Sequence, residues 1–213
     1  MTSTSDKMRA LKSGLRALII ACGVLAWPTP GGERLAQPDK GSWRNVDNLP
    51  SELRPLAREG KEQFEGGNYL QAQRIYRRIL EKAPNNLYAL SNLGVVLFRA
   101  RENQRAEEAL KMAIAVAPGD DFAHCTLGIV YYQEGNYDNA VNQLTTALAI
   151  NPRNATAHNY LGLAASRKGW PEAAEKEMKT AAELDPSYSG GLALPLDAGD
   201  FFTPLEKARL KQP

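Results

Sequence analysis

A period of 34 residues is the feature that most constrains the fold of this chain. Prolines, glycines and alanines recur at this spacing in constant register, at Pro84, Pro118, Pro152 and Pro186, at Gly60, Gly94, Gly128 and Gly162, and at Ala72, Ala106, Ala140 and Ala174. A period of 20 to 50 residues is typical of repeat proteins, in which each unit buries its apolar face only against its neighbours. The period divides the chain into four repeats, 53–86, 87–120, 121–154 and 155–188.

The third repeat shows what each unit contains. One face of a predicted first helix carries His124, Leu127, Gly128 and Tyr131, and one face of a predicted second helix carries Ala140, Leu144, Ala147 and Leu148. Gly135 and Asn136 separate the two helices, because glycine tolerates backbone angles that end a helix. Pro152 closes the second helix, and Asn154 is placed to cap the next one. The pattern therefore predicts a helix-turn-helix unit.

These residues resemble the tetratricopeptide repeat family. The family pattern appears most fully in the second repeat, as Leu90, Leu93-Gly94, Leu97, Ala106, Leu110, Ala113 and Pro118. The first repeat departs from it, because Glu59 stands where the other repeats have leucine. The resemblance covers residues 53–188 and implies an all-α, right-handed α-solenoid of four helix-turn-helix repeats, with the first helices lining a concave groove.

The C-terminal tail, 189–213, does not follow the family pattern. Gly190, Gly191, Pro195 and Gly199 oppose a regular helix over its first part. Further on, Thr203, Pro204 and Glu206 have the order of a helix start, which predicts a short helix over 204–212. This helix is a candidate cap for the fourth repeat.

The N-terminus has the order of an export signal. Basic residues precede an apolar run over 15–27, which is shorter than the roughly 20 residues needed to span a bilayer. We therefore expect 1–27 to be a signal peptide and the protein to be exported to the periplasm or cell envelope of a bacterium. Two alternatives remain: a lipoprotein lipidated at Cys22, and a cytoplasmic chain with an apolar extension. The Pro- and Gly-rich residues 28–50 are predicted to be a linker.

Composition argues against several functional classes. The chain has 26 basic and 24 acidic residues, so no charge excess points to nucleic acid. Two cysteines and two histidines offer little for a disulfide framework, a metal cage or a histidine-based hydrolase. We expect no enzyme activity, no cofactor, no metal site and no small-molecule substrate. Membrane contact is expected only through the N-terminal signal or a lipid anchor.

Partner binding is predicted on the first helices. Five positions of each, the second, fifth, ninth, twelfth and thirteenth, face away from the packed side. The candidate groove residues at these positions are Arg54, Lys61, Phe64, Tyr88, Val95, Phe98, Arg99, Phe122, Ile129, Tyr132, Asn159, Leu163 and Arg167. Contiguous exposed apolar residues usually mark an interaction site. The alternative is that the aromatic residues only pack between adjacent first helices.

The sequence therefore predicts a protein-interaction module or assembly scaffold that binds a segment of a protein partner in its groove. An alternative is an accessory or regulatory subunit of an envelope enzyme complex, with catalysis on the partner. The fold by itself does not choose between them, because one fold hosts many functions.

Overall fold

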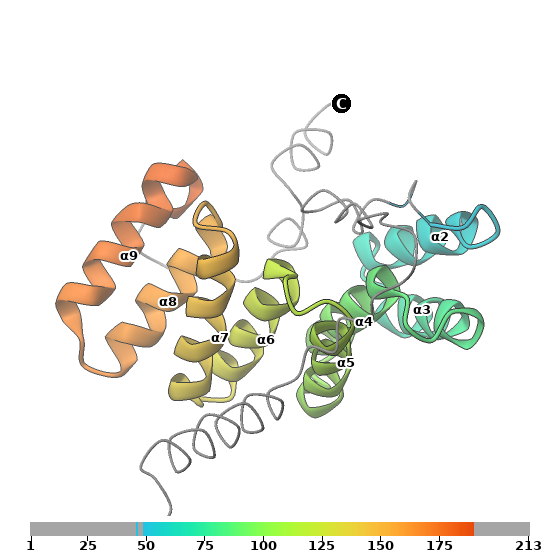
Figure 1. Ribbon diagram of the computed structural model, residues 1–213, viewed down its shortest axis with the longest axis horizontal. Helices are drawn as coiled ribbons and strands as arrows, with labels where there is room; N and C mark the ends of the chain where they lie inside the picture. The colour runs from blue at the N-terminus through green and yellow to red at the C-terminus, as the bar shows by residue number, and fades with distance from the viewer. Residues whose placement is uncertain (1–45, 47–48, 190–213) are drawn as a thin grey trace, which may run out of the picture. The chain divides into compact units, whose positions relative to one another are not determined.

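The computed structural model describes residue 46 and residues 49–189, and this part of the chain contains helices and no strand. The helices are α2 (Arg54–Glu65), α3 (Tyr69–Lys82), α4 (Leu87–Arg99), α5 (Asn103–Val116), α6 (Asp121–Gln133), α7 (Tyr137–Ile150), α8 (Ala155–Arg167) and α9 (Pro171–Leu184), followed by the short 3-10 turn η3 (Pro186–Tyr188) (Figure 1). None of the helices in this described part is both long and apolar enough to span a bilayer. The predicted signal with Cys22, most of the predicted linker and the predicted helix over 204–212 lie outside the described residues.

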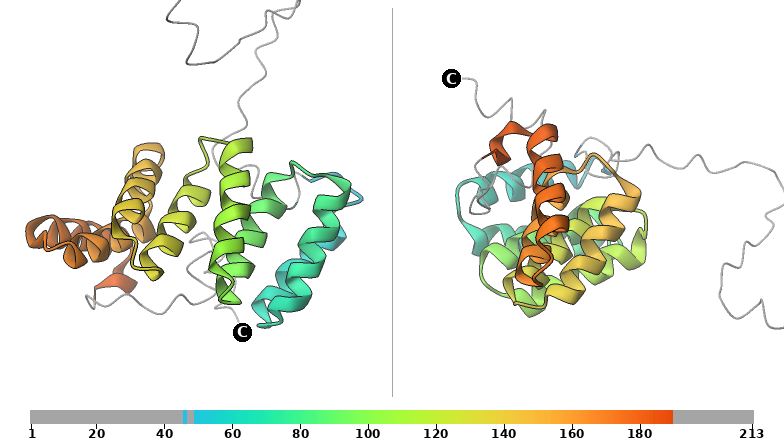
Figure 2. Two further views of the ribbon diagram at one scale, coloured as in Figure 1. Left: turned by 90° about the horizontal axis from the view of Figure 1, so that it is seen from below. Right: turned by 90° about the vertical axis from the view of Figure 1, so that its left-hand side faces the viewer.

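The helices pack in chain order. Each helix from α2 to α9 contacts the next one, and the first helices α4, α6 and α8 also contact one another in sequence (Figure 2). Helix pairs that contact mainly their neighbours form an array rather than a single closed core. The chain is thus an all-α solenoid of helical repeats.

The turn inside each repeat uses one residue with a positive φ angle. Gly67, Gly135 and Gly169 adopt φ of 75°, 75° and 74°, and the equivalent residue of the second repeat is Arg101, with φ of 66°. Glycine adopts this region without steric cost, whereas a residue with a Cβ does not. The second repeat therefore makes the same turn with a strained residue.

The two helices of a repeat approach closely at the repeated glycines. A Cβ added at Gly94 would lie 2.6 Å from Cγ of Leu110, and one added at Gly128 would lie 2.7 Å from Cγ of Leu144. Both distances are shorter than any real carbon contact. The repeated alanines on the opposite helix, Ala72, Ala106, Ala140 and Ala174, are buried at the same helix pairs. Small residues thus set the spacing within a repeat.

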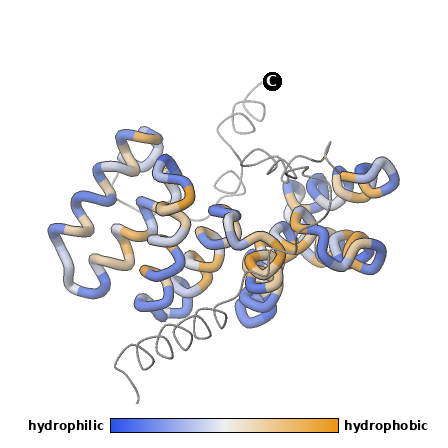
Figure 3. The backbone as a smooth tube through the Cα atoms, in the orientation of Figure 1, coloured by the Kyte–Doolittle hydropathy of each residue, from blue (hydrophilic) through white to orange (hydrophobic). Residues whose placement is uncertain are grey.

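Burial is uneven along the array. Eleven of the thirteen residues of α4 are buried. Among the fourteen residues of α9, only Ala174 and Ala181 are buried. Hydrophilic residues accordingly dominate α9 (Figure 3). A solenoid needs a polar outer face at its end, and α9 supplies one. At the other end, Leu49 is buried against the core, so packing begins inside the predicted linker.

Candidate functional site

The candidate site is the face of α4, α6 and α8 that carries their fifth and ninth residues. Residues four apart lie on one side of a helix, and these three helices contact in order. We call this face the groove floor, and it consists of Ser91, Val95, Cys125, Ile129, Asn159 and Leu163. Five of the six are buried, and Leu163 is half-buried.

Several predicted groove residues do not form an open lining. Phe64, Tyr88, Val95, Phe98, Ile129 and Asn159 are all less than 9% exposed. Two of the aromatic rings pack inside or between repeats: the ring centroid of Phe64 lies 5.8 Å from that of Tyr69, and the centroid of Tyr88 lies 6.1 Å from that of Tyr76. This corrects the expectation of exposed anchors, because large rings gain more by filling the contacts between helices.

The aromatic residues of the third repeat keep part of their surface. Phe122 and Tyr132 are half-buried. The ring of Tyr132 packs edge-on against Tyr160 of the next first helix at 5.7 Å, and lies 5.7 Å from Tyr137. Tyr132 therefore links α6 to α8 while part of its surface stays exposed.

The predicted cationic contacts divide into structural and exposed groups. The Nε atom of Arg54 donates to the carbonyl oxygen of Leu49 at 2.8 Å. A guanidinium nitrogen of Arg99 donates to the hydroxyl of Tyr69 at 3.3 Å, and its charge lies 5.9 Å from that ring. Lys61 forms an ion pair with Glu65 at 3.8 Å on the same helix. Arg167 is exposed at the end of α8.

Asn159 is the unusual polar residue of the groove floor. Its side chain is 4% exposed, and its Nδ2 atom has no hydrogen-bond partner among the described residues. A buried donor without an acceptor costs about 1–3 kcal/mol. A ligand that offered a carbonyl oxygen here would remove this cost.

Tyr188 was not predicted from the sequence as part of the site. Its hydroxyl lies 3.0 Å from Oγ1 of Thr156, the second residue of α8, and the side chain is 4% exposed. The only sequence signal was a lone aromatic residue two positions after Pro186. The contact fixes the chain against the first helix of the fourth repeat as it leaves the array.

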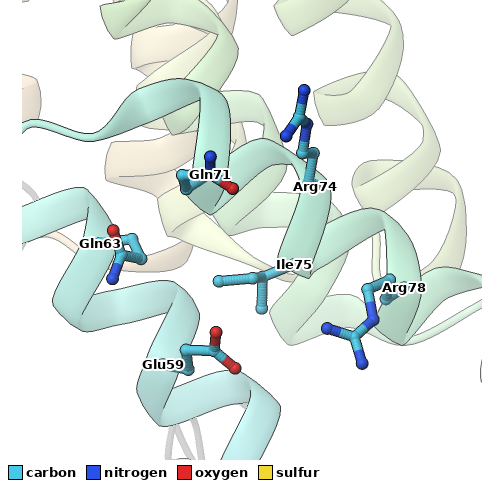
Figure 4. A pocket seen from close by; sticks show the side chains of 6 residues that line it. All are labelled: Glu59, Gln63, Gln71, Arg74, Ile75 and Arg78. Carbon is cyan, nitrogen blue, oxygen red and sulfur yellow. The ribbon is translucent and has the colours of Figure 1, made fainter.

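A separate hollow of about 300 Å³ lies between α2 and α3, away from the groove floor (Figure 4). Its lining comprises Glu59, Gln63, Gln71, Arg74, Ile75 and Arg78. Glu59 stands where the later repeats have the buried or half-buried leucines of their first helices. The hollow therefore results from a polar substitution at the first helix pair.

Family models match nearly the whole described array. Two models described as tetratricopeptide repeat match residues 58–121 and 155–188, and one described as TPR repeat matches residues 128–169. No curated protein matches the sequence.

Solved structures of helical repeats resemble the chain. A structure described as MamA 41-end from Desulfovibrio magneticus RS-1 is 25% identical, with 63% of this chain and 76% of that chain covered and a TM-score of 0.57. A double mutant of MamA RS-1 is 24% identical, with 65% and 78% covered and a TM-score of 0.57. An O-GlcNAc transferase of Thermobaculum terrenum is 27% identical, with a TM-score of 0.58, but the 62% of this chain that aligns covers only 26% of that enzyme.

The matches and the helix arrangement agree on the nature of the chain. They support a protein-interaction scaffold, since repeated helix pairs present extended surfaces to protein partners. The chain belongs to the tetratricopeptide repeat family.

Proposed function

We propose that the protein is an exported scaffold that binds an extended segment of a protein partner on its groove floor, without catalysing a reaction itself. The observation that carries this proposal is the buried Nδ2 atom of Asn159, which has no hydrogen-bond partner among the described residues, on a face whose one other polar residue is Ser91. An extended peptide has carbonyl oxygens that are not used in its own structure. Asn159 is suited to accept such a segment because its amide can donate to one of these oxygens.

The residues around Asn159 favour a peptide segment with apolar side chains. Leu163 lies one turn along α8 and is half-buried, and Phe122 and Tyr132 keep partly exposed rings on α6. Aromatic and aliphatic anchors commonly supply most of the binding energy of an interface. Arg167, exposed at the end of the same face, would then influence association rate and salt dependence more than affinity.

Export is the second element of the proposal. It rests on the order of basic residues and an apolar run in 1–27, which is typical of a signal peptide.

Peptide selection on the intact protein tests groove recognition. Random peptides displayed on phage are selected on the full chain, and the affinity of a selected peptide is measured by fluorescence anisotropy. We expect Leu163→Asp and Asn159→Ala each to weaken binding by about tenfold or more, whereas Glu183→Ala on α9 leaves it unchanged. Peptides that bind the Leu163→Asp variant with full affinity, while its melting temperature is unchanged, would move recognition away from the groove floor.

A further inference from the structure

The first repeat carries an excess of positive charge. Its residues, 53–86, include seven Lys or Arg and four Asp or Glu, whereas the three later repeats together have nine basic and twelve acidic residues. The excess lies on α3, where Arg74, Arg77 and Arg78 are all exposed. A surface of one sign attracts segments of the opposite charge. The first repeat is therefore suited to an acidic partner.

The repeat itself does not require these arginines. The residues one, two and three repeats beyond Arg78 are Met112, Thr146 and Thr180, none of which is charged. In the described part of the chain, neither Arg74 nor Arg78 forms a hydrogen bond or an ion pair. Their guanidinium groups are thus available to a ligand.

The two arginines border the hollow between α2 and α3. Glu59 on α2 and Arg78 on α3 line it from opposite sides, with Ile75 between them (Figure 4). Ile75 is buried and gives the hollow an apolar part, while Glu59, Arg74 and Arg78 are exposed. The volume of about 300 Å³ is at the lower end of the range for ligand pockets. The charges therefore surround a hollow that holds a short segment, rather than a flat surface.

The type and spacing of the basic residues define the ligand. A guanidinium group binds a carboxylate through two parallel hydrogen bonds, which an ammonium group does not do. Arg74 and Arg78 are one helical turn apart, a spacing that places Cβ atoms about 5–6 Å from each other. In an extended chain, side chains two residues apart share one side and lie about 6.6 Å apart. Two acidic residues separated by one other residue match the arginines.

Glu59 favours a peptide over a phosphate group. A phosphate would bring up to about two negative charges into a hollow that already contains a carboxylate. A peptide segment also carries backbone amide groups, and one of these can donate a hydrogen bond to Glu59. The mixed lining therefore suits an acidic peptide better than a phosphorylated ligand.

We propose that the hollow between α2 and α3 binds an extended acidic segment of a protein partner, in which two carboxylates separated by one residue pair with Arg74 and Arg78. This surface is separate from the groove floor. The proposal thus goes beyond the proposed function and does not depend on it.

NMR titration of the full chain with two synthetic peptides of equal charge tests the spacing. Both peptides consist of glycine and serine around a short core, which is Glu-Ala-Glu in one and Glu-Glu-Ala in the other. We expect the Glu-Ala-Glu peptide to shift the amide signals of α2 and α3 around the hollow. It should bind about threefold or more tightly than the other peptide, because only its carboxylates share one side of an extended chain.

Two arginine variants test the hollow itself. Arg78→Glu should weaken binding of the Glu-Ala-Glu peptide by about tenfold or more, since it removes one charge pair and adds repulsion. The matched control is Arg77→Glu, which makes the same charge change on α3 at a residue that does not line the hollow. It should weaken binding by less than about threefold, because salt screens a charge at the surface. Leu163→Asp on the groove floor should leave the affinity unchanged.

Circular dichroism checks that each variant is folded, and Arg78→Gln replaces Arg78→Glu if helix content falls. Equal affinity for the two peptides, equal weakening by both arginine variants, or no shift of α2 and α3 signals would overturn the proposal. Phosphatidylglycerol vesicles are the third probe: vesicle binding that both arginine variants reduce equally, without peptide binding, would assign the surface to a membrane instead. Failure of the proposed function would look different, since it concerns only peptides whose affinity depends on Leu163.

Discussion

The Nδ1 atom of His158 lies 2.6 Å from Oε2 of Glu177, and this contact joins the two helices of the fourth repeat. The other ring nitrogen lies 3.0 Å from the carbonyl oxygen of Pro152. The ring therefore bridges α9 and the turn that precedes α8. The third repeat has the same arrangement with a neutral partner: His124 lies 2.8 Å from Gln143 and 3.1 Å from the carbonyl oxygen of Pro118.

Replacing Glu177 by glutamine should therefore destabilise the fourth repeat. The change exchanges a charge-assisted hydrogen bond for a neutral one, which we expect to reduce the free energy of unfolding by about 1 kcal/mol. Urea denaturation at neutral pH measures the effect. The matched change is Gln143→Glu at the equivalent contact, which should stabilise or leave stability unaltered. A loss of the same size from both changes would argue against a stabilising role for the carboxylate of Glu177.

Arg101→Gly should stabilise the protein. Arg101 holds a φ of 66° at the turn where the other three repeats have glycine. Removing the side chain relieves a backbone cost of about 1–2 kcal/mol, partly offset by the greater freedom of glycine in the unfolded chain. We expect a net gain of about 0.5–1 kcal/mol, visible as a higher melting temperature. The reverse change, Gly135→Arg, should lower the melting temperature. An unchanged melting temperature in both variants would contradict a strained backbone at Arg101.

Gly128→Ala tests the close approach of α6 and α7. The added methyl group would lie 2.7 Å from Cγ of Leu144 and 3.3 Å from the carbonyl oxygen of Ala140. Overfilling a packed contact typically costs about 1–3 kcal/mol, and Gly128→Leu should cost at least as much. Gly119→Ala is the control, because a Cβ there meets no atom within 4 Å. Thermal melting that ranks Gly119→Ala as the more harmful change would refute the assigned helix contact.

Glu107 should stabilise the folded protein at neutral pH and lose this effect at acidic pH. A hydrogen bond from Lys111, together with one from the hydroxyl of Tyr131 at 2.8 Å, lowers the pKa of Glu107 against the opposing effect of desolvation. A lowered pKa in the folded state stabilises the protein above the pKa of the unfolded chain, and this contribution disappears as pH falls through the folded value. Glu107→Gln should therefore reduce stability at pH 7 and make little difference near pH 3. Chemical denaturation of both proteins at both pH values checks this. A larger loss of stability from Glu107→Gln at pH 3 than at pH 7 would contradict the prediction.

The export proposal predicts a shortened N-terminus. We expect mature protein isolated from its own cells to begin between about residues 22 and 37, because signal peptides are removed after the apolar run. Mass spectrometry of the intact protein gives the first residue. Processing at Cys22 that is blocked by globomycin would select the lipoprotein alternative, and an intact N-terminus on cytoplasmic protein would exclude export.

The sequence alone determined the repeat and its local structure. The 34-residue spacing of glycine, alanine and proline places two helices in each unit, and the structure has those helices with Asn154 capping α8 through a 3.0 Å bond to the amide of Ala157. These features depend on contacts between residues that lie close together in the sequence. Such contacts leave a periodic pattern, because every copy must satisfy the same local geometry.

Only the tertiary structure decided which residues of the first helices remain accessible. Phe98 and Tyr132 occupy equivalent positions, yet Phe98 is 6% exposed while Tyr132 is half-buried against Tyr160. The contact of Tyr188 with Thr156, 32 residues apart, leaves no periodic signal at all. Burial depends on what neighbouring repeats and the chain beyond them place against a side chain, and the period of one repeat carries no information about those distant contacts.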